Sequence, residues 1–250
     1  MVEKKEKIIE EVPEGISKDR GFNVENWKPK TELGRKVKSG EINDIDEIFD
    51  KGYKILEPEI IDALLPSLES SLIQAGQSKG KFGGGKRSIW IQTQKKTKEG
   101  SNIKFSTVAV VGNKNGYVGV GHGKSKETMP AREKSIKQAK LSIIRIKRGC
   151  GSWESGGENA YSIPFKVSGK SGAAKIDLIP APKGTGLCVE NECKRILQLA
   201  GIKDIYSKSK NSKTKLNLIK ACFDALKKLS KVRVNENFAK EHNIVEGKIK

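Results

Sequence analysis

The sequence predicts an α+β protein in which two mixed domains follow an N-terminal extension. Segments with apolar residues at helical spacing alternate with segments rich in β-branched residues. A length of 250 residues gives each of two domains enough chain to bury a core. Hydrophobic residues make up 35% of the chain and 26 residues are glycine, which is too apolar a composition for a disordered protein.

The extension is expected to cover residues 1–55 and to contain short helices. Residues 1–25 are rich in lysine and glutamate and are interrupted by proline and glycine, so we expect an extended arm. Residues 41–51 predict an acidic helix, because Ile42, Ile45, Ile48 and Phe49 recur at helical spacing.

The first domain is expected over residues 56–142. A helix is predicted to begin near Glu57, and Pro66 should kink or end it. Its apolar residues, at helical spacing, are Ile60, Ile61, Leu64, Leu65, Leu68 and Leu72. A loop rich in glycine and lysine follows at 76–86. Three β-rich segments come next, at 88–97, 103–111 and 117–120, and Asn115-Gly116 suits a tight hairpin turn between the last two.

A long helix over residues 126–144 is expected to close this domain. Its inward stripe would carry Met129, Ile136, Ala139 and Ile143, with lysines on the other side. The resulting order is helix, three antiparallel strands, helix (α-β-β-β-α), which is the arrangement of a double-stranded-RNA-binding-type domain.

A second α/β domain is expected over residues 143–230. Segments 165–168 and 173–179 flank a glycine-containing turn and predict a hairpin. Segments 189–200 and 215–229 have the spacing of amphipathic helices, with a short strand at 204–207 between them. We expect residues 180–186 and these two helices to provide enough apolar surface to dock a neighbouring protein. Residues 231–250 are expected to form a polar tail.

The charge of the chain indicates a polyanionic partner. Lysine and arginine number 49 against 30 acidic residues, a formal net charge of +19. The charge is segregated, since residues 76–148 contain 18 basic and only 3 acidic residues. A solvated coat would mix the signs, so this imbalance favours contact with nucleic acid in the middle of the chain.

Other classes of protein fit poorly. No apolar run reaches the length of a membrane span, and the first residues lack an apolar signal core, so we expect a soluble, unprocessed cytoplasmic protein. Two histidines provide no catalytic constellation, and no cofactor or metal site is expected. The irregularly spaced cysteines should be small buried or half-buried hydrophobes; they are Cys150, Cys188, Cys193 and Cys222.

Residues 119–125, GVGHGKS, lie between a predicted strand and a predicted helix. Their glycine spacing fits neither a Walker loop nor a dinucleotide fingerprint. We expect free N–H groups at the helix start, with Lys124 and Lys126, to bind an RNA phosphate, and Gly121 and Gly123 to let the RNA backbone approach. The alternatives are a plain glycine turn, with His122 as a turn residue, and nucleotide chemistry.

Several further basic residues are expected to contact phosphates from strand ends and loops. Trp153, in a glycine-rich loop, can stack on an unpaired base or pack against its own loop. The full set of candidate RNA-binding residues is Lys95, Lys96, Lys98, Lys104, Asn113, Lys114, Asn115, Gly121, Gly123, Lys124, Lys126, Lys147, Arg148, Trp153 and Lys183.

A collinear set of segments resembles the universal S5 family of small-subunit ribosomal proteins. These segments are FSTVAVVGNKNGYVGVG at 105–121, KSKE at 124–127, AKLSII at 139–144, RGCGSW at 148–153, LIPAPKGTGL at 178–187 and LQLAGIKD at 197–204. Residues 27–31 (WKPKT) and 60–66 (IIDALLP) resemble the archaeal and eukaryotic branch. The resemblance covers about four fifths of the chain.

This resemblance implies a double-stranded-RNA-binding-like domain followed by a left-handed α/β domain. It also implies a place near the messenger entry channel, beside the third and fourth small-subunit proteins, and a part in decoding accuracy. Members of this branch often carry cysteines after the tryptophan, where Ser155 and Gly157 stand here, which removes any argument for a metal.

We therefore expect a structural ribosomal protein that binds small-subunit RNA, with no chemistry of its own. Its expected partners are ribosomal RNA, the third and fourth small-subunit proteins and messenger RNA at the entry channel, and it should have no membrane contact. The alternatives are a free double-stranded-RNA-binding regulator and a nucleotide hydrolase that uses residues 119–125.

Overall fold

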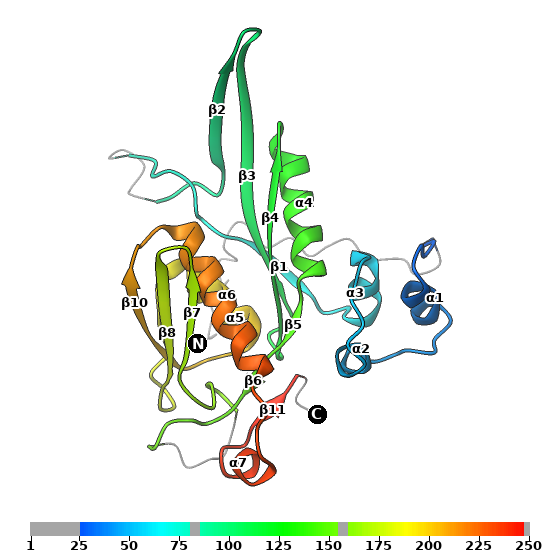
Figure 1. The fold of residues 1–250 in the computed structure, drawn as a ribbon, viewed down its shortest axis with the longest axis vertical. Coiled ribbons are helices and arrows are strands. Elements are labelled where there is room, and N and C mark those ends of the chain that lie inside the picture. The colour runs from blue at the N-terminus through cyan, green and yellow to red at the C-terminus, as the bar shows by residue number, and fades with distance from the viewer. Residues whose placement is uncertain (1–25, 81–85, 155–159, 248–250) are drawn as a thin grey trace, which may run out of the picture.

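The computed structural model describes residues 26–80, 86–154 and 160–247, so the arm expected over residues 1–25 lies outside the described part. The molecule is layered (Figure 1). The first sheet, which contains β1 to β5, lies toward the right of this view with α4 beside it. The second sheet, which contains β7 to β10, lies on the left, with α6 between it and the first sheet. A two-stranded ribbon near the C-terminus adds a third, small sheet.

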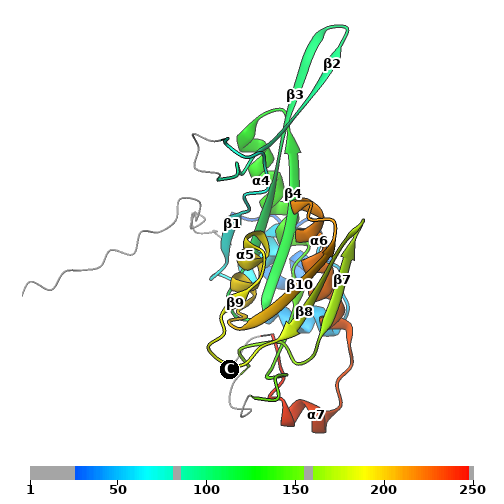
Figure 2. The ribbon, with the colours of Figure 1, turned by 90° about the vertical axis from the view of Figure 1, so that its left-hand side faces the viewer.

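The first sheet has the strand order β1-β3-β4-β5, with β2 also paired to β3. Its strands are β1 (Glu69–Leu72), β2 (Ile91–Thr97), β3 (Gly100–Gly112), β4 (Tyr117–Ser125) and β5 (Ile144–Arg145). The long strand β3 pairs antiparallel with β2 over its first half and with β1 over its last four residues. The β2–β3 hairpin therefore continues beyond the sheet and projects from the molecule (Figures 1 and 2).

Three expectations for this domain need correction. Helix α3 (Pro58–Leu64) ends before Pro66, and residues 69–72 form β1 rather than a further helical turn, because Pro66 cannot donate a helical N–H bond. Strand β4 extends through Ser125, so residues 119–125 are strand and not loop. Helix α4 (Thr128–Leu141) leaves Met129 59% exposed and faces the sheet with small residues, including Ala131 and Ala139.

Two helices of the extension pack with α3 of the first domain around a small core. Helices α1 (Glu32–Lys38) and α2 (Ile45–Asp50) precede α3, and α1 was not anticipated as a helix. Thr31 caps α1 by accepting a bond from the Gly34 N–H. The buried Glu57 carboxylate accepts bonds from the backbone N–H groups of Lys30 and Thr31 at 2.8 and 2.5 Å, which ties the start of α1 to α3.

The second sheet has the order β7-β8-β10-β9. Strands β7 (Val167–Ser171) and β8 (Ala174–Pro180) form the expected hairpin, and β10 (Ile205–Asn211) extends the expected short strand. Helix α5 (Asn191–Ala200) connects β9 (Leu187–Cys188) to its parallel neighbour β10. Helix α6 (Lys215–Lys231) matches its predicted range closely.

One hydrophobic core spans both predicted domains. It joins Val108 and Val110 of the first sheet to Ile196 of α5 and Leu226 of α6, all 3% exposed or less. The boundary expected at 142/143 stays a prediction. The apolar faces of α5 and α6 point into this core, so they do not supply the docking surface that their amphipathic spacing suggested, and the exposed residues of α6 are mainly lysines.

The segment expected as a polar tail is largely folded. Helix α7 (Glu236–Glu241) packs near Cys150, whose backbone N–H donates to the His242 carbonyl at 2.9 Å. Strand β11 (Val245–Glu246) then pairs antiparallel with β6 (Lys147–Arg148). Charged residues dominate this segment, and the partners that hold it are themselves charged groups, which composition alone does not reveal.

Candidate nucleic-acid interface

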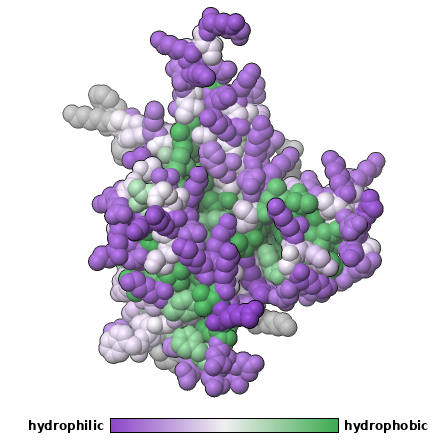
Figure 3. Space-filling view, viewed as in Figure 1, coloured by the Kyte–Doolittle hydropathy of each residue, from purple (hydrophilic) through white to green (hydrophobic). Residues whose placement is uncertain are grey.

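The projecting β2–β3 hairpin brings four of the candidate residues together. Lys95 and Lys96 lie in β2, Lys98 lies in the turn and Lys104 lies in β3, and all four are exposed. Six of the seven residues of β2 and the first five of β3 are exposed. The tip of the hairpin, at the top of Figure 3, is covered by hydrophilic residues.

The hairpin carries lysines on both of its faces. Lys104 pairs with Thr93 and shares a face with Lys95, whose own partner is Asn102. Lys96 points to the other face, beside the exposed amides of Gln92 and Gln94. These amides were not anticipated, although the polar run over 92–98 lacks the alternation of a half-buried strand. A hairpin of this kind can contact phosphates from two sides at once.

Lys124 and Lys126 lie near the base of this hairpin. Lys124 pairs with Ser106, and both lysines are exposed. His122, expected in a turn, is an exposed residue within β4. Partial burial, together with the positive charges of Lys220 and Lys124, lowers the pKa of His122.

The glycines of β4 serve helix packing. A Cβ on Gly121 would lie 2.2 Å from both the Ala139 nitrogen and the Ser135 oxygen, and one on Gly123 would lie 2.1 Å from the Ala131 oxygen. The expectation that they let an RNA backbone approach is therefore wrong, because α4 already occupies that space. The predicted strand-to-helix phosphate loop does not exist in this form.

Asn113, Lys114 and Asn115 lie at the opposite end of β3 from the hairpin tip. The Asn113 side-chain oxygen accepts the backbone N–H groups of Asn115 and Tyr117, at 2.8 and 3.2 Å, and so shapes the β3–β4 turn. Lys114 donates its backbone N–H to the Leu199 carbonyl of α5, and its ammonium lies 2.6 Å from Glu69. The two asparagines are thus structural, and only the Lys114 side chain remains exposed.

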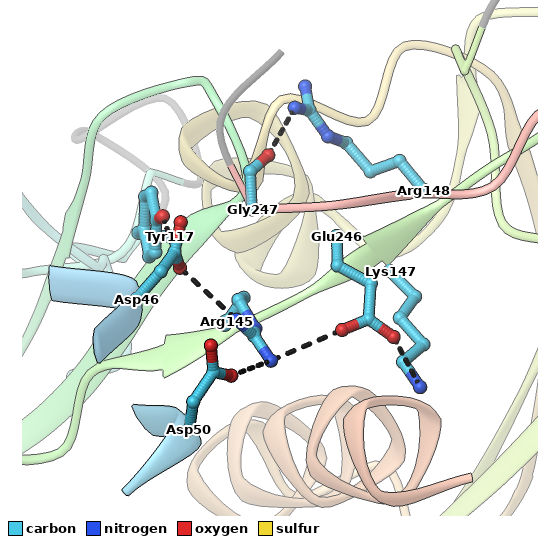
Figure 4. Close-up of polar contacts among 8 residues, drawn as sticks. All are labelled: Asp46, Asp50, Tyr117, Arg145, Lys147, Arg148, Glu246 and Gly247. Carbon is cyan, nitrogen blue, oxygen red and sulfur yellow. Dashed lines mark hydrogen bonds and ion pairs between the residues drawn. The ribbon is translucent and has the colours of Figure 1, made fainter. Parts of the chain in front are cut away.

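Lys147 and Arg148 are buried, which corrects the expectation that they reach outward. They are 8% and 3% exposed. The Lys147 ammonium lies 2.6 Å from both Glu246 and the Val232 carbonyl. Arg148 donates to Asn115 and to the Gly247 carbonyl, each at 2.8 Å, and burial lowers the pKa of its guanidinium (Figure 4). Both residues hold the C-terminal segment in place.

Arg145 completes this cluster and was not singled out by the sequence. Its guanidinium lies 2.9 Å from Asp50, 3.2 Å from Glu246 and 3.4 Å from Asp46 (Figure 4). Burial alone would lower the pKa of Arg145, but these carboxylates, Asp50 foremost, raise it. The cluster joins the extension, the first sheet and the C-terminal strand.

Trp153 and Lys183 lie on two separate loops. Trp153 is 91% exposed, so the alternative in which it packs against its own loop is wrong. Lys183 is exposed in the turn between β8 and β9. Their contact with RNA stays a prediction.

Among the described residues, no group of three His, Cys, Asp or Glu side chains is placed to hold a metal ion. The four cysteines are free thiols; three are buried as expected, but Cys188 is exposed at the edge of the second sheet. None of the helices in residues 26–80, 86–154 and 160–247 is long and apolar enough to cross a bilayer.

Comparison with known proteins decides the family. Residues 91–147 match the model of the ribosomal protein S5 N-terminal domain, and residues 169–242 match that of the S5 C-terminal domain. This chain belongs to the ribosomal protein S5 family. The matched ranges contain the β2–β3 hairpin in the first case and α5, α6 and α7 in the second.

Archaeal members of the S5 family align along nearly the whole chain. Small ribosomal subunit protein uS5 of Nanoarchaeum equitans is 50% identical over 228 residues, which are 91% of this chain and 98% of that protein. The uS5 proteins of Methanocaldococcus jannaschii and Methanosphaera stadtmanae are 46% and 45% identical, over 91% and 90% of this chain and 99% and 93% of their own lengths.

As an S5-family protein, the chain is a structural constituent of the small ribosomal subunit in the cytoplasmic ribosome, and it binds ribosomal RNA. It is not an enzyme, so the nucleotide-hydrolase alternative is wrong. The two-domain α+β architecture with S5 N- and C-terminal domains is confirmed.

Proposed function

We propose that the β2–β3 hairpin is the main element through which this protein binds small-subunit RNA. Its four lysines stand on both faces and at the turn of a ribbon that projects from the core. Within 91–104 the only acidic residue is Glu99, so little internal charge competes with phosphate. The projection of the hairpin is the observation that carries the proposal, because it lets the lysines enter a groove of the RNA that a flat protein surface could not reach.

This hairpin would help the protein bridge RNA segments near the messenger entry channel, beside the third and fourth small-subunit proteins. Messenger RNA is a further candidate partner there. In that position the protein would support subunit assembly and decoding accuracy. Lys124 and Lys126, near the base of the hairpin, and Lys114, Trp153 and Lys183 elsewhere, would add contacts to the same RNA.

The salt dependence of RNA binding tests the proposal. The hairpin variant Lys95→Gln/Lys96→Gln/Lys98→Gln is compared with the control Lys28→Gln/Lys36→Gln/Lys54→Gln, which removes three exposed lysines from the extension. Each lost phosphate contact should flatten the slope of log affinity against log salt by about 0.7–0.9. A slope equal to that of the control would refute the role of the hairpin.

Sedimentation addresses the alternative of a free double-stranded-RNA-binding regulator. The native protein should travel with small subunits, and the hairpin variant should be released from them at a lower salt concentration than the control. A native protein found mainly away from subunits would favour the regulator.

A further inference from the structure

The second sheet leaves one of its faces open. Helix α6 packs closely on the inner face, where a Cβ on Gly169 would lie 2.0 Å from the Ala221 oxygen. Burial alternates along β7, where Val167 and Gly169 are buried but Ser168 and Lys170 are exposed. On β8, Lys175 is exposed on the same face, whereas the neighbouring Asp177 is buried beneath its lysine partners. Figure 2 turns the side of the molecule that bears this sheet toward the viewer.

The residues of the open face form three rows across the strands. Lys170, Lys175 and Lys210 are direct cross-strand neighbours on β7, β8 and β10. The next row contains Ser168, Asp177 and Lys208, and the third contains Ile179, Tyr206 and Cys188. Lysine thus occupies a complete row, and an aromatic ring lies two rows away.

The complete lysine row is unfavourable in the isolated protein. Neighbouring Cβ atoms of such pairs are about 5 Å apart, and like charges directly opposite one another destabilise a sheet. Asp177 is the only carboxylate in these rows, and it lies 2.9 Å from Lys210, which lowers the pKa of Asp177. Within the described residues, the ammonium groups of Lys170, Lys175 and Lys208 form no ion pair with a carboxylate, although the backbone N–H of Lys170 donates to Asp224 at 3.1 Å. A bound anion would relieve this repulsion.

Tyr206 supplies a different contact on the same face. It is 41% exposed and lies between Ile179 and the exposed Cys188, which gives its ring flat apolar surroundings. An exposed aromatic ring on a sheet surface is a stacking platform for an unpaired base. Protein interfaces, in contrast, are depleted of lysine at their centres. The combination of a lysine row with an exposed tyrosine therefore favours RNA as the occupant.

We propose that this open face is a second RNA-binding surface, which takes a single-stranded stretch of RNA. Phosphates would contact Lys170, Lys175, Lys208 and Lys210, and one base would stack on Tyr206. The surface is separate from the β2–β3 hairpin, so this inference extends the RNA binding proposed above without depending on the hairpin.

The first test uses the full chain and full-length small-subunit ribosomal RNA as the probe. The open-face variant Lys170→Gln/Lys175→Gln/Lys208→Gln breaks no described ion pair, and Lys28→Gln/Lys36→Gln/Lys54→Gln is its charge-matched control. Three single-strand contacts predict a fall of about 2 in the log–log salt slope. A slope equal to that of the control overturns the proposal. If only the hairpin variant then loses slope, the proposed function still stands.

The second test identifies the occupant in assembled subunits. A photoreactive phenylalanine analogue replaces Tyr206 in the full chain, which retains a ring at an exposed position. Crosslinks to ribosomal RNA support the proposal. Crosslinks to a neighbouring protein, or no crosslink at all in subunits that have incorporated the chain, overturn it.

Discussion

Replacing Gly121 with alanine separates a packing role for this glycine from a role in RNA binding. The new Cβ would lie 2.2 Å from the Ala139 nitrogen and the Ser135 oxygen and 2.7 Å from the Gln138 carbonyl carbon. All three atoms belong to the backbone of α4, so no side chain can rotate away. Ordinary contact begins near 3.4 Å, and the helix would have to move by about 1 Å.

The cost of this movement is large for a single methyl group. Overpacking in a core usually costs about 1–3 kcal/mol, and a contact with helix backbone belongs at the upper end of that range. The neighbouring Gly119 and Gly123 make equally close approaches to α4, so the helix cannot tilt away at one point without losing fit at the others. We expect a loss of about 3 kcal/mol, which corresponds to a fall in Tm of roughly 6–12 °C for a chain of this size.

Thermal and denaturant unfolding measure this loss, with Lys124→Ala as the control. Lys124 is exposed on the same strand, so its replacement should change stability by about 0.5 kcal/mol or less. RNA affinity, measured at a temperature where both variants are folded, should fall for Lys124→Ala and not for Gly121→Ala. A Gly121→Ala protein with native stability but weakened RNA binding would refute the packing argument.

Three further predictions concern other parts of the molecule. Arg148→Met should lower the free energy of unfolding by about 1–3 kcal/mol, because the Asn115 and Gly247 oxygens lose their hydrogen-bond donor. The slope of log RNA affinity against log salt should stay unchanged. A flatter slope would contradict the structural role of Arg148. Burial alone would raise the pKa of Glu57, but hydrogen bonds from Thr31 and Lys30 lower it. The stability that these bonds provide is therefore complete above the ordinary glutamate pKa of 4.5 and is lost as pH falls through the lower pKa of the folded state. Glu57→Gln should therefore show a shallower loss of stability below pH 4.5 than the native chain in acid titrations followed by circular dichroism. In thiol titrations the exposed Cys188 should react in the folded protein, whereas the three buried cysteines should react only on unfolding. The hydrogen bond with the Cys222 thiol, together with burial, also raises the pKa of Cys193 and so disfavours its reactive thiolate. Rapid reaction of more than one thiol in the native state would count against this arrangement.

The sequence predicted those elements whose side-chain pattern reflects a single buried face. Helix α6 matches its expected range, and the β7–β8 hairpin was predicted as a hairpin, because each packs one face on the core; β7, however, extends through Ser171 into the expected turn. The apolar pattern led to a wrong prediction where a helix and the strand after it continue the same helical spacing of apolar residues. Leu68 and Leu72 continue the helical spacing of the preceding residues but lie in or beside β1, where they pack on the first sheet.

The candidate site was predictable where basic residues cluster without apolar neighbours, as at Lys95 and Lys96. Local charge could not show that Lys147 and Arg148 turn inward, because their partners Glu246 and Gly247 lie about 100 residues later. The glycines of β4 were misread for a related reason. A glycine that admits a helix and one that admits a phosphate look the same until the tertiary neighbour is known.

The pairing of β11 with β6 also sets the order of events during synthesis. Residues 147–148 leave the translating ribosome well before 245–246, and at usual elongation rates the interval is roughly 5–20 s. Throughout that interval the guanidinium groups of Arg145 and Arg148 and the Lys147 ammonium lack the Glu246 carboxylate and the Gly247 carbonyl that later enclose them. Until residues 246–247 are synthesised, Lys147 and Arg148 therefore lack contacts that bury them in the folded protein and are open to competing polyanions, whereas Arg145 already has Asp46 and Asp50 as partners.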